Sequence, residues 1–129
     1  IVREGSDLTM ISSGSMMRPT LKAADILEEA EGVKAEVSDV LTISPLDDET
    51  FTKSVQKTGR AVIVHEAAKS FGPGAELMAR LVEKSFWYLE APIKRVTGYD
   101  IVMPLFAYEN MYLPSADRVV RGAREVLQV

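Results

Sequence analysis

The sequence predicts an α/β fold in which a mostly parallel sheet lies between two layers of helices. Short apolar segments alternate with amphipathic helical segments along the chain, and residues 61–64 are apolar at every position. A continuous apolar run of this length is typical of a central parallel strand that is covered on both faces. Parallel strands need crossover connections, so the alternation indicates a three-layer α/β/α arrangement.

Two strands and two helices are expected before this central strand. Residues 8–12 favour a strand, and the apolar positions after Gly14 recur at helical spacing until Gly32 ends the helix. Residues 33–37 alternate between apolar and charged side chains, as in a half-buried strand. Residues 47–57 then form a helix, and Asp47 caps its N-terminus.

The second half of the chain continues the alternation. A helix with a strong apolar stripe follows Gly72 and ends before Pro92, and a strand over 93–96 comes next. Residues 99–113 show no helical period, and Pro114 opens a last helix. Arginines recur at every third position of this last helix, and we expect a solvent-exposed face at Arg118, Arg121 and Arg124.

The composition is that of one globular domain over residues 1–129. The net charge is −4, and the chain contains no cysteine. The negative charge disfavours nucleic acid as a partner. The lack of cysteine excludes disulfides and thiolate metal sites and favours a reducing, cytoplasmic compartment. No apolar run approaches the roughly 18 residues of a membrane-spanning helix, so we expect no membrane partner.

His65 and Glu66 directly follow the central strand, where open α/β sheets place ligands. One interpretation of this position is a polar pair that faces a cleft or a neighbouring domain, and the favoured interpretation is a histidine that loop backbone satisfies. One histidine without cysteines does not supply the usual metal ligands. Residues 72–74 lack a nucleotide-binding glycine pattern and indicate a turn and helix start. We therefore expect no catalytic, cofactor-binding or metal-binding residue in this chain.

Aromatic residues and methionines are concentrated in the second half of the chain, many of them in residues 99–113. Both residue types are enriched at subunit interfaces. One helix and one strand do not need so many large apolar side chains for their own core. We therefore predict a subunit interface there, with a role in the core as the alternative, at Met103, Tyr108, Met111 and Tyr112.

Local motifs follow one another in a fixed order from end to end. The most specific are Lys57-Thr-Gly-Arg60, Val64-His-Glu-Ala67 and Tyr88-Leu-Glu-Ala-Pro92. The others lie at residues 2–7, 14–16, 42–47, 72–76 and 112–114. Together they resemble the C-terminal domain of the β subunit of thiamine-dependent 2-oxo acid dehydrogenases, which has the transketolase C-terminal domain fold.

This resemblance implies a mixed five-stranded sheet with one antiparallel edge strand, for which residues 1–3 are the candidate. It implies one part of an α₂β₂ enzyme that decarboxylates pyruvate or a branched-chain 2-oxo acid and transfers the acyl group to lipoamide. Thiamine diphosphate and magnesium would lie between the α subunit and the N-terminal domain of the β subunit, so this chain alone is expected to be inactive. The implied partners are the α subunit, the N-terminal domain of the same β subunit, a second β subunit and the acyltransferase's peripheral binding domain.

The resemblance also implies a docking surface for that basic peripheral domain. Counted onto this chain, the surface consists of Glu90 and the terminal carboxylate of Val129, with Phe86 as an apolar neighbour. Two carboxylates would accept charge-assisted hydrogen bonds from an arginine or lysine of the partner, and such bonds are stronger than neutral ones.

The alternative is a function of a different class. A doubly wound α/β chain of this length is also the size of a free-standing module that binds a small ligand or a nucleotide. Such a module favours a phosphate loop richer in glycine than residues 72–74. A response regulator would carry an aspartate where this chain has His65 and Glu66.

Overall fold

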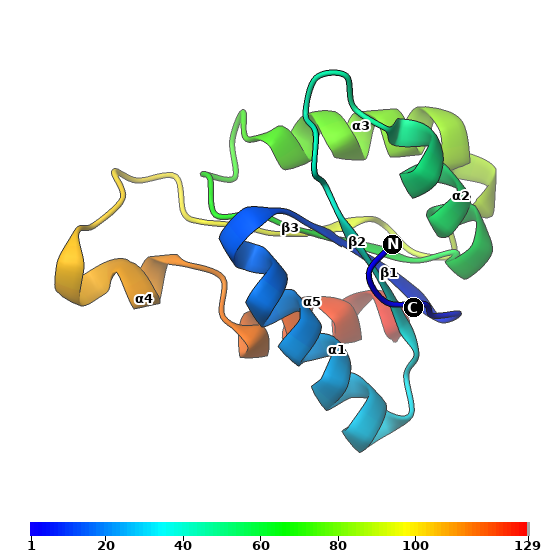
Figure 1. Ribbon diagram of the computed structural model, residues 1–129, viewed down its shortest axis with the longest axis horizontal. Helices are drawn as coiled ribbons and strands as arrows, with labels where there is room; N and C mark the ends of the chain where they lie inside the picture. Colours follow the sequence, from blue (N-terminus) through cyan, green and yellow to red (C-terminus); the bar gives the residue numbers. More distant parts are fainter. Residues whose placement is uncertain (129) are drawn as a thin grey trace.

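In the computed structural model, which describes residues 1–128, a parallel sheet lies between two layers of helices (Figure 1). Every pair of neighbouring strands is parallel, which confirms the predicted fold class. The strands lie in the order β2-β1-β3-β4. Their bounds are Leu8–Ser12 for β1, Ala35–Asp39 for β2, Ala61–Val64 for β3 and Lys94–Val96 for β4.

Helices α1 and α5 cover one face of the sheet, and α2 and α3 cover the other (Figure 1). A short helix α4 precedes α5, and three single turns of 3₁₀ helix lie between the longer elements. The bounds are Met17–Glu31 for α1, Asp48–Thr58 for α2, Pro73–Ser85 for α3, Glu109–Tyr112 for α4 and Ala116–Leu127 for α5. The 3₁₀ turns lie at Gly14–Met16, Phe86–Tyr88 and Phe106–Tyr108.

Strands β1 and β3 contribute side chains to both layers, because successive residues of a strand point to opposite faces. Val62 and Val64 pack with α1 and α5, while Ala61 and Ile63 pack with α2 and α3. All four residues are buried, as the continuous apolar run predicted. Fully burying one side chain of valine or isoleucine size contributes about 1.5–3 kcal/mol, so this strand is central to the stability of both cores.

Helix boundaries follow the expected signals with one difference. The Asp47 carboxylate caps α2 by accepting a hydrogen bond from the Thr50 N–H at 3.2 Å, and Gly32 ends α1 with a φ of 71°. Helix α3 ends at Ser85 and not shortly before Pro92 as the apolar stripe suggested. A 3₁₀ turn over Phe86–Tyr88 follows α3, and the N–H of Glu90 then donates to the Gly59 carbonyl at the end of α2, at 2.8 Å.

The predicted antiparallel edge strand over residues 1–3 is reduced to a single bridge, in which Arg3 pairs with Val37. The sheet of the described residues therefore has four strands, not five. The chain turns across β2 at Gly5, where a Cβ atom would lie 2.2 Å from the Glu36 backbone nitrogen. This close approach ends the antiparallel pairing after one bridge.

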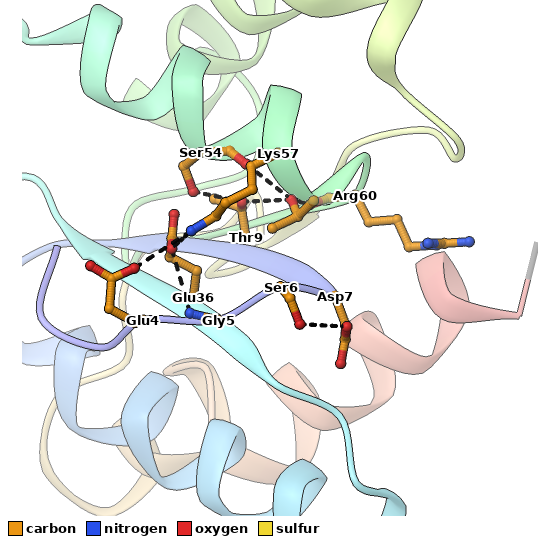
Figure 2. A network of polar contacts seen from close by, with 10 residues as sticks. Glu4, Gly5, Ser6, Asp7, Thr9, Glu36, Ser54, Lys57 and Arg60 are labelled. Atoms are coloured by element: carbon orange, nitrogen blue, oxygen red, sulfur yellow. Dashed lines mark hydrogen bonds and ion pairs between the residues drawn. The ribbon is translucent and has the colours of Figure 1, made fainter.

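A buried carboxylate on β2 anchors this crossing (Figure 2). Glu36 is fully buried, and the Lys57 ammonium group on α2 donates a hydrogen bond to it. The Gly5 N–H donates to the same carboxylate at 3.4 Å, and Glu4 lies 3.5 Å from the Lys57 nitrogen. The Glu36 carboxylate thus connects the N-terminal segment, β2 and α2.

Beside it, three hydroxyl groups form a second buried connection between α2 and the sheet (Figure 2). The Thr9 hydroxyl on β1 lies 2.7 Å from that of Ser54 and 2.8 Å from that of Thr58. Both partners come from α2, one turn apart. These three hydroxyl groups are therefore paired with one another, which avoids the cost of burying them alone.

The charge of Glu36 depends on its partners. Burial alone would raise the pKa of the Glu36 carboxyl group, but hydrogen bonds, first of all from Lys57, hold that pKa below its ordinary value. A lowered folded-state pKa contributes stability above the pKa of the unfolded chain, and that stability is lost as the pH falls through the folded value. The pair therefore stabilises the fold near neutral pH.

We predict that Lys57→Met lowers the free energy of unfolding by about 1–3 kcal/mol near neutral pH, because Glu36 then remains charged without its partner. The deficit should shrink between about pH 7 and about pH 4, since burial without Lys57 favours the protonated carboxyl group. Urea denaturation of both proteins across this range measures the effect.

Lys53→Met is the matched control, because Lys53 lies on the same helix and pairs with Glu49 at the surface. Its removal should cost less than about 1 kcal/mol at every pH. Equal losses from the two substitutions would contradict a special role for the buried carboxylate.

Candidate interaction surfaces

His65 lies where β3 ends. We call the side of the sheet formed by the carboxyl ends of the four strands the carboxyl edge. The His65 side chain is only 6% exposed and lies against the loop that starts α3. A Cβ atom at Gly74 would lie 2.5 Å from the Cδ2 and Nε2 atoms of the ring, so this glycine makes room for the histidine. The glycines at 72–74 therefore serve packing, beyond the turn and helix start that the sequence indicated.

No well-formed hydrogen bond to the His65 imidazole is present among the described residues, but the Ala67 backbone lies close enough to the ring to act on its pKa. Loop backbone thus encloses the ring. Burial lowers the pKa of His65, and the nearby Arg95 guanidinium lowers it further. The ring is therefore neutral at physiological pH and carries one donor and one acceptor nitrogen.

Glu66 is exposed, in contrast to its neighbour. Its carboxylate accepts a hydrogen bond from the Ser15 hydroxyl at 2.7 Å, which joins the loops after β1 and β3. The sequence pair is therefore divided: the histidine is directed into the fold, while the glutamate lies at the surface of the carboxyl edge.

The segment of residues 99–113, called the aromatic segment below, exposes most of its large apolar side chains. Met103, Tyr108 and Met111 are all exposed, with Met111 71% accessible. The segment lies beside the sheet and ends in the short helix α4 (Figure 1). The exposed apolar neighbours in the same segment are Ile101, Val102, Leu105 and Phe106.

Tyr112 differs from the other predicted interface residues, because its side chain is only 6% exposed. Its ring contacts the Tyr99 ring edge to face at a centroid distance of 6.2 Å, and a Cβ atom at Gly98 would lie 2.5 Å from it. In this chain Tyr112 therefore packs inside the fold, the alternative that the sequence left open.

The last helix holds the aromatic segment through Arg118, which does not belong to a solvent-exposed face as the sequence suggested. The Arg118 guanidinium donates to the carbonyls of Thr97 at 2.6 Å and Tyr112 at 3.1 Å. It also lies over the Tyr99 ring, 4.6 Å from the centroid. One side chain thus fixes both ends of the segment to α5.

Two of the three predicted docking residues lie at the opposite edge of the sheet. Phe86 is 58% exposed beside Trp87, with the two rings perpendicular and 5.2 Å apart. The Glu90 carboxylate pairs with Arg60 at 2.6 Å, and the Arg60 Nε donates to the Val126 carbonyl at 3.1 Å. Arg60 therefore places Glu90 beside the end of α5, and Val129 itself lies outside the described residues.

Residues 1–128 contain neither a cluster of three metal-binding side chains nor a helix that could span a membrane. No three side chains of histidine, aspartate or glutamate in this range lie together as metal ligands would. None of its helices is both long enough and apolar enough to cross a membrane. The His65 ring lies against the loop at the start of α3, where a diphosphate group would need to approach. The His65 ring therefore fills the space beside the loop at the start of α3, so that loop does not form an open cradle for a diphosphate group.

Comparison with known proteins identifies similar chains. The pyruvate dehydrogenase E1 component subunit beta of Acholeplasma laidlawii is 42% identical over 126 residues, which cover 98% of this chain and 38% of that protein. The corresponding subunit of Bacillus subtilis is 44% identical over 99% of this chain and 39% of its own length. The mitochondrial 2-oxoisovalerate dehydrogenase subunit beta of Dictyostelium discoideum is 49% identical over 88% of this chain and 30% of its own length.

The fold and the family agree with these similarities. A solved structure described as a split gene transketolase, inactive beta4 tetramer, superposes with a TM-score of 0.80 at 29% identity, over 99% of this chain and 40% of that one. This chain spans less than two-fifths of the three relatives above. The family model described as "Transketolase, C-terminal domain" matches residues 1–119, so the chain belongs to the transketolase C-terminal domain family.

Proposed function

We propose that this chain is the C-terminal assembly and docking domain of the β subunit of a thiamine-dependent 2-oxo acid dehydrogenase. The observation that carries this proposal is its alignment, over nearly its whole length, with β subunits of pyruvate and 2-oxoisovalerate dehydrogenases. The parent enzyme would decarboxylate pyruvate or a branched-chain 2-oxo acid in the cytoplasm and transfer the acyl group to lipoamide. Thiamine diphosphate supplies the electron sink for decarboxylation when bound, outside this chain.

The aromatic segment is proposed as a contact with a second β subunit. Large exposed apolar patches on a folded domain mark interaction sites, because water contact with them is unfavourable. Arg118 and the buried Tyr112 hold the aromatic segment against the fold. The exposed apolar side chains of this segment therefore lie on a supported surface, meaning one that is fixed to the domain. A supported surface loses less conformational entropy on binding than a free loop.

We predict that Met111→Asp weakens self-association of the chain, because a carboxylate would be desolvated in an apolar contact. The dimer dissociation constant, measured by analytical ultracentrifugation at high protein concentration, should rise at least about tenfold. Ile1→Asp is the control, since Ile1 is exposed at the N-terminus, far from α4 in Figure 1. A strictly monomeric chain, or equal effects of both substitutions, would contradict the predicted interface.

The second proposed surface is the corner formed by Phe86, Trp87, Glu90 and Arg60, for the basic peripheral domain of the acyltransferase component. A wide apolar groove of about 590 Å³ lies here between α3 and the residues before β4. Glu90 is the acidic residue of its lining, and Arg60 holds that carboxylate near the end of α5. An apolar groove with an acidic rim fits an apolar residue flanked by arginine or lysine.

We predict that Glu90→Ala in the complete heterotetramer weakens binding of the cognate peripheral domain by about 1–3 kcal/mol, as expected for a hydrogen bond to a charged partner. Deletion of Val129 should cost a similar amount if the terminal carboxylate is the second acceptor. Isothermal titration calorimetry measures both effects.

Glu83→Ala is the matched control for these variants, because Glu83 is an exposed acid on α3 that does not line the groove. It should leave the affinity within about twofold of the parent value. Unchanged affinity in both test variants would show that the peripheral domain docks elsewhere, while the assignment of the chain to its family would stand.

A further inference from the structure

A small pocket lies between β4, the outermost strand on its side of the described sheet, and helix α5. Arg95 and Val96 line it from β4, and Arg118, Arg121 and Gly122 line it from α5. The three helix positions share one face, because residues three and four apart are neighbours on a helix. The pocket measures about 210 Å³, which is far more than one water molecule requires.

Gly122 lets the helix lie directly against the strand at the floor of this pocket. A Cβ atom at Gly122 would lie 2.6 Å from the Cγ2 atom of Val96, so a larger residue would push α5 away from β4. The close contact brings the arginines of the helix and the arginine of the strand to one place. Sequence position alone separates Arg95 from Arg118 by a loop and the short helix α4.

The lining of the pocket carries an excess of positive charge. Glu125 is its sole carboxylate among the described residues, and that carboxylate pairs with Lys94. Arg95, Arg118 and Arg121 remain, and none of them forms an ion pair within residues 1–128. Like charges repel, so three uncompensated cations at one pocket favour the binding of an anion, although the chain as a whole carries a net charge of −4.

The same three side chains keep hydrogen-bond donors that no protein group uses. A guanidinium group has five N–H donors. Arg95 donates once, to the Lys69 carbonyl at 2.8 Å, and Arg118 donates to the two backbone carbonyls described above. Arg121 is exposed, and its side chain makes no hydrogen bond within residues 1–128. Carbonyl partners therefore orient Arg95 and Arg118 without neutralising their charge.

This combination of charge and donors is suited to an oxyanion. A planar guanidinium group donates paired hydrogen bonds to a carboxylate or a phosphate. Coulomb attraction grows with the charge of the ligand, so three cations favour a doubly charged anion over a singly charged one. A phosphate monoester carries about −1.5 to −2 charges at pH 7 and three acceptor oxygens. It therefore matches the lining better than one carboxylate does.

We propose that this pocket binds the phosphate group of a small molecule, with Arg95 and Arg118 as oriented donors from two elements and Arg121 as the third cation. The site lies apart from the Glu90 corner, and it shares only Arg118 with the residues that hold the aromatic segment. The test below leaves Arg118 unchanged, so its failure would leave the proposed function intact.

The test is a titration of the chain with inorganic phosphate and with methyl phosphate at constant ionic strength, followed by nuclear magnetic resonance. The backbone N–H signals of Val96 and Gly122 report on the floor of the pocket. We expect a saturable shift with both compounds, and the tighter of the two identifies a free or an esterified phosphate as the ligand. Acetate, which carries one charge, should bind at least about 10-fold more weakly.

Variants separate this pocket from general attraction to positive charge. Arg121→Gln should weaken phosphate binding about 3- to 10-fold, and Arg95→Gln, which removes a half-buried donor, at least as much. Arg18→Gln is the matched control, because Arg18 is an exposed arginine on α1 that does not line the pocket. It should leave the affinity within about twofold of the parent value. Circular dichroism verifies that each variant is folded.

Four results would overturn the proposal. The first is the lack of a saturable shift with either phosphate compound. The second is equal weakening by Arg121→Gln and Arg18→Gln, which would indicate general charge attraction and no defined site. The third is an acetate affinity equal to that of phosphate. The fourth is hexaglutamate that binds at least about 10-fold more tightly than methyl phosphate, which would make an acidic polypeptide segment the occupant.

Discussion

Strands β1 and β3 are buried on both faces, and the rest of the structure depends on this burial. An apolar strand in the middle of a sheet needs a helix layer on each side, and these layers are α1 with α5 and α2 with α3. The crossovers that alternate between the layers make neighbouring strands parallel. All strands therefore end at one edge, and the loop that carries His65 and Glu66 lies there.

Polar interactions then fix the parts that the apolar cores leave free. Lys57 neutralises the buried Glu36 where the N-terminal segment crosses β2. Arg118 holds the aromatic segment through two carbonyls and one ring, and Arg60 joins the Glu90 corner to α5. Each of these cations connects segments that lie far apart in the sequence, which is how a small fold orders its loops without disulfides.

The two edges of the sheet have different chemical properties. The carboxyl edge combines a small pocket with a neutral buried imidazole, whereas the opposite edge has an open apolar groove next to a paired carboxylate. The open groove is the one proposed above for an apolar side chain of the peripheral domain. The aromatic segment provides a third surface, whose exposed apolar area is typical of a contact between protein parts.

The sequence by itself determined the order of strands and helices, the central position of residues 61–64, the caps at Asp47 and Gly32, and the family. These features depend on local periodicity and on motifs, which can be read over a few residues. Only the tertiary structure decided that His65 and Tyr112 are buried, that residues 1–3 form one bridge, and that Arg118 binds carbonyls. These outcomes depend on contacts between distant segments, such as Gly74 beside the His65 ring and Gly98 beside Tyr112, which local pattern does not specify.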